Sequence, residues 1–312
     1  MQSNCGNLGN YWRRVVRVYI HARLDFINRL SLLPRRTWVP KVKVNGVELF
    51  YKESGRGPET IIFSHGLLMD HSMFEAQRAA LEPQYRVIAY DHRGQGESGD
   101  PGNGQDMDTL TTDAAALIQA LGAAPCHFAG LSMGGFVGMR LAARRPLLVR
   151  TLTLMNTGPD REPWTNRLRY GFLARMVALV GTAPFTGIAA KQLFGKTTRG
   201  NPAQRAMLDE WTGKLKRRPR NVAEALSGVM NRQEVTPDEL RSIGCPTVVI
   251  AGEDDTARPP DDSERLASFI PGARLVRIPG CGHSSSLEAP QAVIQALEAL
   301  ITAERPRMVS GK

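Results

Sequence analysis

The sequence predicts an α/β fold: a doubly wound, mostly parallel sheet covered by helices on both faces. Short apolar segments typical of buried strands alternate with segments whose apolar residues recur at helical spacing. This alternation stops once, after residue 156, for about ninety residues of helical, Pro- and Gly-punctuated sequence. Because so long a connection is unusual between adjacent elements, we expect a helical insertion. The expected α/β core covers residues 41–156 and 246–304, and the expected helical cap covers residues 157–245.

The expected core begins with a hairpin. Residues 41–44 and 47–51 have strand-like sequence, and the Asn-Gly pair at 45–46 favours a type I′ turn. Further strands are expected at about residues 60–64, 86–90, 125–129, 151–155, 247–251 and 274–278. Helices are expected over residues 108–121 and 289–303, where Ala, Leu and Ile recur at helical spacing and would cover the sheet.

A serine between glycines stands where one expected strand meets a helix. The stretch Gly130-Leu131-Ser132-Met133-Gly134 follows the apolar run 125–129 and opens a helix that continues through Arg145. This pattern, G-x-S-x-G, is the nucleophile elbow, where side chains beside the serine would collide with the sharply reversing backbone. The turn presents the Ser132 hydroxyl, and the Met133 N–H becomes one donor of an oxyanion hole. Ser132 is therefore the predicted nucleophile.

A serine nucleophile needs a base and a carboxylate that orients the base. Both residue types follow later strands. The run 247–251 ends in Gly252-Glu253-Asp254-Asp255, and the run 274–278 ends in Pro279-Gly280-Cys281-Gly282-His283. Because neighbouring parallel strands end at one edge of the sheet, these side chains are expected to meet Ser132 there. His283 is the predicted base, and an aspartate of the preceding loop is the predicted acid.

Taken together, these motifs resemble those of the α/β-hydrolase superfamily over residues 42–303. Residues 61–67 (IIFSHGL) look like the family's strand and His-Gly oxyanion turn, and residues 91–98 (DHRGQGES) look like the turn after the next strand. The resemblance implies a catalytic triad of Ser132, Asp255 and His283. Asp255 is chosen over Asp254 because family enzymes place the acid fourth in G-x-x-D. The resemblance also implies that the Leu67 N–H is the second oxyanion donor, beside that of Met133.

Within the superfamily, residues 130–156 are most similar to 3-oxoadipate enol-lactonases and small esterases. The chain lacks the His-Gly-Gly-Gly run of one lipase type, the tryptophan that cofactor-free haloperoxidases often carry after His-Gly, and the elbow aspartate of epoxide hydrolases and dehalogenases. The resemblance therefore implies hydrolysis of a small-molecule carboxylic ester or lactone through a Ser132 acyl-enzyme, without a cofactor. Two alternatives stay open: acyl transfer or perhydrolysis by the same triad, and a non-catalytic ligand receptor. The sequence does not identify the substrate-binding residues.

Other polar residues of these motifs are interpreted as structural. His65 is expected to hold the oxyanion turn, and Asp91 and Arg93 to stabilise the fold. Asn156 occupies a position where some family members carry an alternative acid, so an asparagine there favours Asp255. Cys281 is expected to be a small packing residue. The histidines show no ligand spacing with Asp, Glu or Cys, so no metal site is expected.

The composition indicates the class of protein and the cellular compartment. Hydrophobic residues make up 42% of the sequence and charged residues 22%, which is ordinary for a globular protein with a sizeable core. The four cysteines show no Cys-x-x-Cys spacing and do not suit a disulfide framework, which favours a reducing cytoplasm.

The net charge of +10 is unevenly distributed. Residues 157–235 hold fourteen Lys or Arg against six Asp or Glu, outside the expected α/β core. No RNA-binding aromatic signature or paired Cys/His finger is present, so no nucleic-acid partner is expected. The basic insertion either attracts an anionic substrate to the cleft or forms a solvated outer face, which includes the run 214–218. The arginines near its start are Arg161, Arg167, Arg169 and Arg175.

Residues 1–40 form a basic extension with seven arginines and one aspartate. Residues 11–33 alternate arginines with apolar and aromatic residues, which fits a basic amphipathic helix on a membrane surface or another subunit. A helix packed on the surface of the domain itself, or a disordered extension, is the alternative interpretation. The segment is too charged to span a bilayer and lacks the apolar core of a secretory signal. The oligomeric state is left open.

Overall fold

The computed structural model describes residues 40–304, so the predicted extension lies, apart from Pro40, outside the described residues. Within them, eight strands form one sheet in the order β1-β2-β4-β3-β5-β6-β7-β8. Pairing is antiparallel from β1 to β2 and from β2 to β4, and parallel between all later neighbours. The strands are β1 (Lys41–Val44), β2 (Val47–Ser54), β3 (Thr60–Ser64), β4 (Arg86–Tyr90), β5 (Cys126–Leu131), β6 (Val149–Met155), β7 (Thr247–Gly252) and β8 (Arg274–Ile278).

The sheet is buried on both faces at its centre. Every residue of β3, β5 and β7 is buried, as expected for continuous apolar runs in a parallel sheet. Successive residues of one strand enter opposite cores: Ile62 packs with the residues of one face, and Ile61 and Phe63 with those of the other. The edge strand β8 is mostly exposed and carries charged residues, including Arg277. The predicted α/β class with a mostly parallel sheet is confirmed.

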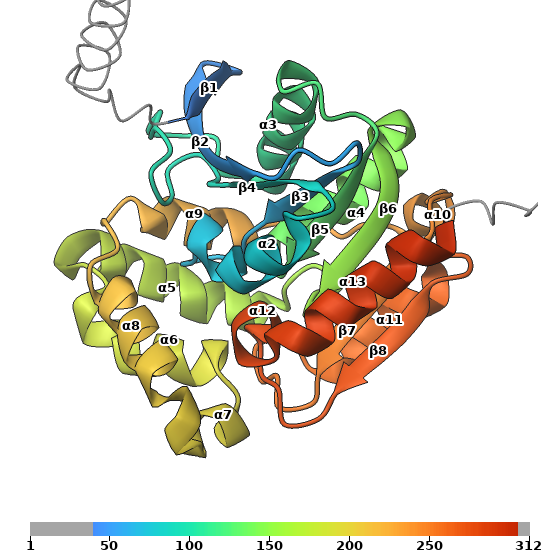
Figure 1. Cartoon of the computed structure of the whole chain (residues 1–312). Coiled ribbons are helices and arrows are strands. Elements are labelled where there is room, and N and C mark those ends of the chain that lie inside the picture. Colours follow the sequence, from blue (N-terminus) through green and yellow to red (C-terminus); the bar gives the residue numbers. More distant parts are fainter. Residues whose placement is uncertain (1–39, 305–312) are drawn as a thin grey trace, which may run out of the picture. The chain divides into compact units, whose positions relative to one another are not determined.

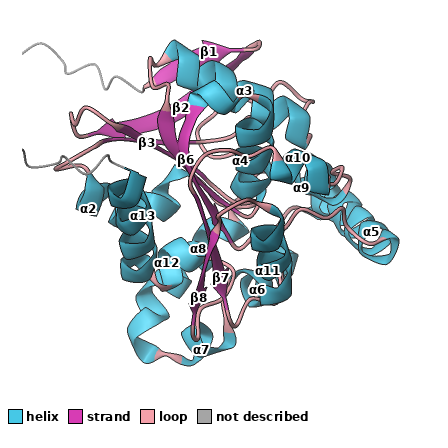
Figure 2. Ribbon diagram, turned by 90° about the vertical axis from the view of Figure 1, so that its right-hand side faces the viewer, coloured by secondary structure: helices cyan, strands magenta, loops and turns pink. Residues whose placement is uncertain are grey.

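Helices cover the two faces, as the edge-on view of the sheet in Figure 2 shows. One face carries α2 (Glu75–Leu81), α12 (Ser285–Glu288) and α13 (Pro290–Glu304), and α2 packs on α13. The other face carries α3 (Met107–Ala120), α4 (Met133–Arg144), α10 (Pro237–Arg241) and α11 (Pro260–Phe269). None of the helices between residues 40 and 304 is both long and apolar enough to cross a bilayer.

Between β6 and β7 the described chain forms helices and no strand. These are α5 (Trp164–Val180), α6 (Thr186–Leu193), α7 (Lys196–Gly200), α8 (Arg205–Lys216) and α9 (Val222–Met230), followed by α10. In Figure 1, α5 to α8 gather beside one end of the sheet. Trp211 and Leu215 of α8 are buried in the same apolar cluster as Phe63 of β3. This insertion therefore shares part of its core with the sheet.

Candidate active site

Ser132 follows β5 directly and precedes α4, with φ 52° and ψ −108°. A non-glycine residue rarely adopts this backbone conformation, which costs on the order of 1–3 kcal/mol and recurs at functional sites. Its neighbours hold it in place: the Ser132 N–H donates to Met155 O at 2.8 Å, and the Thr157 hydroxyl donates to Ser132 O at 3.0 Å. The predicted elbow thus forms the tight turn between strand and helix.

The elbow glycines are required by close backbone contacts. A Cβ on Gly130 would lie 2.2 Å from the carbonyl oxygen of Gly134, and a Cβ on Gly134 would lie 2.0 Å from that of Ser64. Both distances are shorter than any tolerable contact, and the atoms they meet are backbone. A side chain at either position would therefore push β3, β5 and α4 apart.

Asp255 and His283, from the loops after β7 and β8, form a buried pair. Asp255 Oδ2 lies 2.8 Å from His283 Nδ1, and only 4% of Asp255 and 5% of His283 is exposed. The other carboxylate oxygen, Oδ1, accepts from the N–H groups of Ala257 at 2.9 Å and Arg258 at 2.8 Å. With Nδ1–H donating to the carboxylate, a neutral His283 ring keeps Nε2 free as an acceptor.

The two aspartates of this loop turn in different directions. Asp254 Oδ2 accepts from the Thr197 N–H of α7 at 2.9 Å, whereas Asp255 is bonded to His283. The Asn156 side chain, directly after β6, adds a donor to Asp255 Oδ2 at 3.0 Å and a second bond to Gly282 O at 3.1 Å. Asn156 therefore connects the acid to the loop that carries the imidazole.

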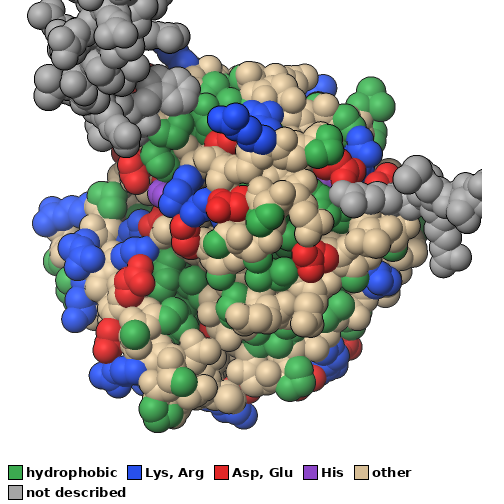
Figure 3. Space-filling view, viewed as in Figure 1, with side chains coloured by type: hydrophobic (Ala, Val, Ile, Leu, Met, Phe, Trp, Pro, Cys, Tyr) green, Lys and Arg blue, Asp and Glu red, His purple; other side chains and the backbone are tan. Residues whose placement is uncertain are grey.

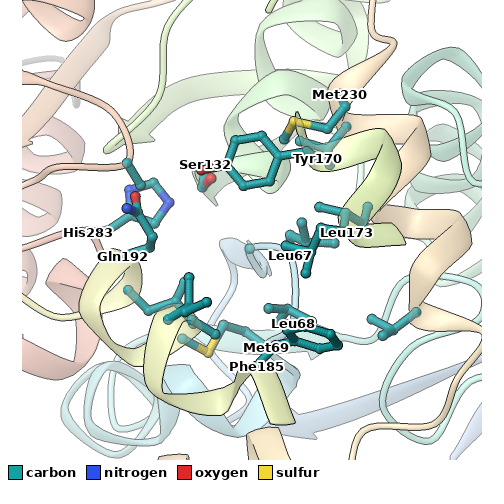
Figure 4. Close-up of a pocket in the computed structure, with 18 of the residues that line it drawn as sticks. Leu67, Leu68, Met69, Ser132, Tyr170, Leu173, Phe185, Gln192, Met230 and His283 are labelled. Carbon is teal, nitrogen blue, oxygen red and sulfur yellow. The ribbon is translucent and has the colours of Figure 1, made fainter. Parts of the chain in front are cut away.

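Ser132 and His283 line the same pocket, and Figure 4 shows both side chains at its wall. Among the described residues, no hydrogen bond joins the Ser132 hydroxyl to the imidazole. Catalytic hydrogen bonds are often long in ligand-free structures and shorten when a substrate binds. The geometry therefore brings the three predicted triad residues to one site, with the Asp255–His283 half formed.

The two predicted oxyanion donors belong to the elbow and to the turn packed against it. Met133 is the first residue of α4, so its N–H has no acceptor inside the helix. Leu67 lies in the turn after β3, and its N–H donates to no acceptor in residues 40–304. This turn is in contact with the elbow, because a Cβ on Gly66 would lie 3.5 Å from Ser132 Cβ.

The oxyanion turn is held by a buried histidine. His65 Nδ1 lies 2.8 Å from Gly66 O, and the N–H of His92 donates to His65 Nε2 at 3.0 Å. This arrangement requires the neutral ring, with its proton on Nδ1, and burial lowers the pKa of His65. Asp91 accepts from backbone N–H groups, including that of Glu97, and Arg93 is paired with Asp113.

The insertion also holds this turn. The Arg218 guanidinium donates to Leu68 O and to Asp70 Oδ2, both at 2.8 Å, and Lys214 donates to Ser72 Oγ at 2.8 Å. Burial alone would raise the pKa of Asp70, but the charge of Arg218 and the hydrogen bonds from Ser72 and Arg218 hold it well below its usual range. The run 214–218 is therefore only partly a solvated face.

A pocket of about 330 Å³ opens above Ser132. Its wall is mostly apolar and comes from the oxyanion turn and from the insertion. The labelled residues of Figure 4 show both sources, and the apolar lining includes Leu67, Leu68, Met69, Leu173, Val177, Phe185, Ile188, Leu193, Val222 and Met230. Sequence reasoning named no substrate-binding residue, because these side chains meet only through the packing of the insertion.

One part of the wall is charged. Glu162 pairs with Arg258 and, at 3.0 Å, with Arg232, and both guanidinium groups lie over the ring of Phe136. Glu162, Arg258 and Phe136 line the pocket. Of the four arginines near the start of the insertion, Arg169 alone contributes to the lining of this pocket as described. No group of three or more His, Cys, Asp or Glu suited to a metal occurs between residues 40 and 304.

Comparisons with known proteins agree with this architecture. Residues 59–290 match the family model described as the alpha/beta hydrolase fold. A Klebsiella pneumoniae protein named "Putative carbamate hydrolase RutD" is 29% identical over 237 residues, covering 74% of this chain and 86% of that protein. A Pseudomonas savastanoi protein of the same name is 30% identical, covering 74% of this chain and 88% of its own.

Solved structures of hydrolases also superpose on this fold. A thermophilic esterase from Thermogutta terrifontis superposes with a TM-score of 0.79 at 27% identity, covering 86% of this chain and 98% of its own. The enol-lactonase from Burkholderia xenovorans LB400 superposes with a TM-score of 0.77 at 28% identity, covering 84% of this chain and all of its own.

Proposed function

The chain belongs to the α/β-hydrolase fold family, and from this premise we propose that it cleaves a carboxylic ester or lactone through an acyl-enzyme on Ser132. Hydrolysis is the activity that the family and the named relatives have in common. The observation that carries the proposal is the buried Asp255–His283 pair, which leaves Nε2 of a neutral imidazole available in the pocket that Ser132 lines.

In the first step, His283 Nε2 takes the Ser132 proton as Oγ attacks the carbonyl carbon of the substrate. The carbonyl electron pair moves to oxygen, and the N–H groups of Leu67 and Met133 stabilise that oxyanion; removing one such donor costs about 3–4 kcal/mol in comparable sites. Asp255 fixes the tautomer of the imidazole and stabilises its positive charge. The tetrahedral intermediate then collapses, the carbon–oxygen bond to the leaving group breaks, and His283 protonates the departing alkoxide.

Deacylation repeats this sequence with water. His283 takes a proton from water, hydroxide attacks the acyl carbon, and Ser132 leaves as a hydroxyl with the proton from the imidazole. The apolar wall of the pocket suits an apolar group of modest size next to the scissile carbonyl. A carbamate, the substrate type in the names of the relatives, offers the same carbonyl electrophile, so the substrate panel includes carbamate esters beside acyl esters and lactones.

The test compares wild type with Ser132→Ala on p-nitrophenyl acetate, p-nitrophenyl butyrate, lactones and an aryl carbamate. We expect Ser132→Ala to lower kcat/KM by at least about a thousandfold, because the nucleophile is removed. Ser227→Ala is the matched control: it removes a serine hydroxyl of the insertion that is bonded to Asn231 and does not line the pocket, and should leave turnover within a few-fold. Wild-type turnover by Ser132→Ala would contradict the proposal.

The same experiment separates the other interpretations of the site. A fluorophosphonate probe should label wild type at Ser132 and leave Ser132→Ala unlabelled. An inert Ser132 together with tight binding of a ligand would favour a non-catalytic receptor. Product formation that needs an added alcohol or peroxide in place of water would favour acyl transfer or perhydrolysis.

A further inference from the structure

Helix α5 exposes a row of large apolar side chains. Trp164, Leu168, Phe172 and Leu179 are 71%, 66%, 66% and 67% exposed. Their spacing of four and seven residues places them on one side of the helix. Apolar residues scattered singly on a surface need no explanation, but a continuous row on one helix face indicates an interaction surface. We call these four residues the α5 stripe.

The opposite side of α5 faces the pocket. Asn166, Arg169, Tyr170, Leu173 and Val177 line the cavity above Ser132, and none of the stripe residues does so. One side of the helix therefore lines the pocket and the other is exposed to solvent. Substitutions in the stripe change no residue of the candidate catalytic site. Its contact with the rest of the insertion is made largely through α9.

The charges on α5 are all positive. The helix contains Arg167, Arg169 and Arg175 and no Asp or Glu, and all three arginines are exposed. Within the described part of the chain these guanidinium groups form no ion pair. Lys and Arg side chains follow the left-hand rim of the molecule in Figure 3, where Figure 1 shows α5, with hydrophobic side chains beside them.

We propose that the α5 stripe, together with Arg167 and Arg175, binds the surface of an anionic lipid bilayer; Arg169 lines the pocket and is not part of this surface. A helix with an apolar face that contains Trp and Phe, flanked by arginines, matches the physical requirements for lying in the headgroup region: the apolar face enters the acyl boundary and the cations meet anionic headgroups. A second copy of the chain fits this surface less well. A two-fold contact would place the same face on itself and bring unpaired arginines of both helices together.

The experiment measures co-sedimentation of the full chain with phosphatidylcholine vesicles that contain phosphatidylglycerol, and with pure phosphatidylcholine vesicles. Wild type should bind the anionic vesicles, and raising NaCl from about 50 mM to about 500 mM should release it, because the electrostatic part is screened. The triple variant Trp164→Ser/Leu168→Ser/Phe172→Ser should lose at least about tenfold in partition coefficient. Leu147→Ser is the matched control, since Leu147 is 88% exposed and lies after α4, outside the stripe.

Three outcomes would overturn the proposal. The first is the absence of wild-type binding to anionic vesicles at low salt. The second is binding of the folded triple variant as strong as that of wild type, which would locate the binding elsewhere in the chain. The third is a wild-type dimer in sedimentation equilibrium that the triple variant abolishes, without any vesicle binding, which would assign the stripe to a second copy. Unchanged turnover of a small soluble ester shows that the triple variant is folded.

Discussion

At Ser132 and Asn156 the backbone takes a positive φ, 52° and 50°, one residue after the adjacent strands β5 and β6. In each case the neighbouring strand secures the strained residue, since Ser132 N–H donates to Met155 O and Asn156 N–H donates to Ile250 O, both at 2.8 Å. The sheet therefore stabilises two unfavourable conformations side by side. One presents the candidate nucleophile, and the other turns an amide toward the candidate acid.

The amide of Asn156 should be needed for activity rather than for the fold. Asn156→Gly keeps a residue that tolerates positive φ and removes the hydrogen bonds to Asp255 and Gly282. A hydrogen bond to a charged group contributes about 1.5–3 kcal/mol, so we expect kcat/KM to fall roughly 10- to 100-fold. The decrease should be mainly in kcat, because Asn156 is not part of the pocket lining.

Asn45→Gly is the control for this change. Asn45 has φ 45° in the β1–β2 hairpin, and its side chain bonds Asp113. Activity should stay within a few-fold of wild type. Comparable losses of kcat/KM in both variants would show that Asn156 acts through general stability, and an unaltered Asn156→Gly enzyme would remove its positioning role.

At the scale of single elements, α8 and the residues directly after it form hydrogen bonds to a turn that is far away in the sequence. Arg218 lies 150 residues from Leu68, whose carbonyl it binds, and Leu68 follows the predicted oxyanion donor Leu67. Leu68 itself has φ 68°, so this turn is also in an unfavourable conformation. The insertion thus helps to hold one half of the candidate oxyanion site in addition to lining the pocket.

Arg218→Ala should therefore impair catalysis by loosening the oxyanion turn. The variant loses the bonds to Leu68 O and Asp70, and we expect kcat to fall about tenfold or more while KM changes less. Arg217→Ala is the matched control, because Arg217 is the exposed neighbour with the same charge. The measurement is kcat and KM of both variants on one p-nitrophenyl ester. Equal kcat values for the two variants would contradict the role assigned to Arg218.

Elements with a local signal could be predicted from the sequence, and contacts made by packing could not. The helix expected at residues 108–121 is found as Met107–Ala120, and the strand expected at residues 151–155 begins two residues earlier, as Val149–Met155. The three predicted triad residues could be located because each follows a strand that the sequence predicts, and the topology then brings them together. Glu162 and Arg258 are 96 residues apart, and no periodicity in the sequence indicates their pairing.

At the scale of the whole molecule, the centre of the sheet contains a polar network without charge. The Ser64 hydroxyl lies 3.0 Å from Tyr90 Oη and 3.0 Å from His92 Nε2, and the His92 N–H is bonded to His65. These groups are almost fully buried beside the candidate oxyanion turn. Burial lowers the pKa of His65 and lowers that of His92 well below its ordinary value. Protonation of His92 would place a charge in the core without a carboxylate partner, and protonation of His65 would remove the acceptor of the His92 N–H, although Asp91 lies 3.9 Å away.

This network predicts that the fold loses stability in mild acid, before most carboxylates titrate. Below the unfolded-state pKa of about 6.5, the unfolded chain binds protons on His65 and His92 that the folded chain does not, so the free energy of unfolding falls as pH falls. Each histidine can bind at most one proton more in the unfolded chain than in the folded chain, so about 1.4 kcal/mol per pH unit is the upper limit of its contribution.

His71 provides the control, because its folded-state pKa is raised and its effect on the pH dependence of stability has the opposite sign. Burial would lower its pKa, but the hydrogen bond to Asp91 and the charge of that carboxylate raise it. Its contribution is therefore complete below pH of about 6.5 and is lost only as pH rises through the folded-state pKa. Urea unfolding of wild type and His71→Gln between pH 6.5 and 5.0 should give the same decrease, whereas His92→Asn should flatten it, because His92 no longer binds a proton on unfolding. A flat wild-type profile, or a slope that His92→Asn leaves intact, would show that the buried histidines do not govern acid stability.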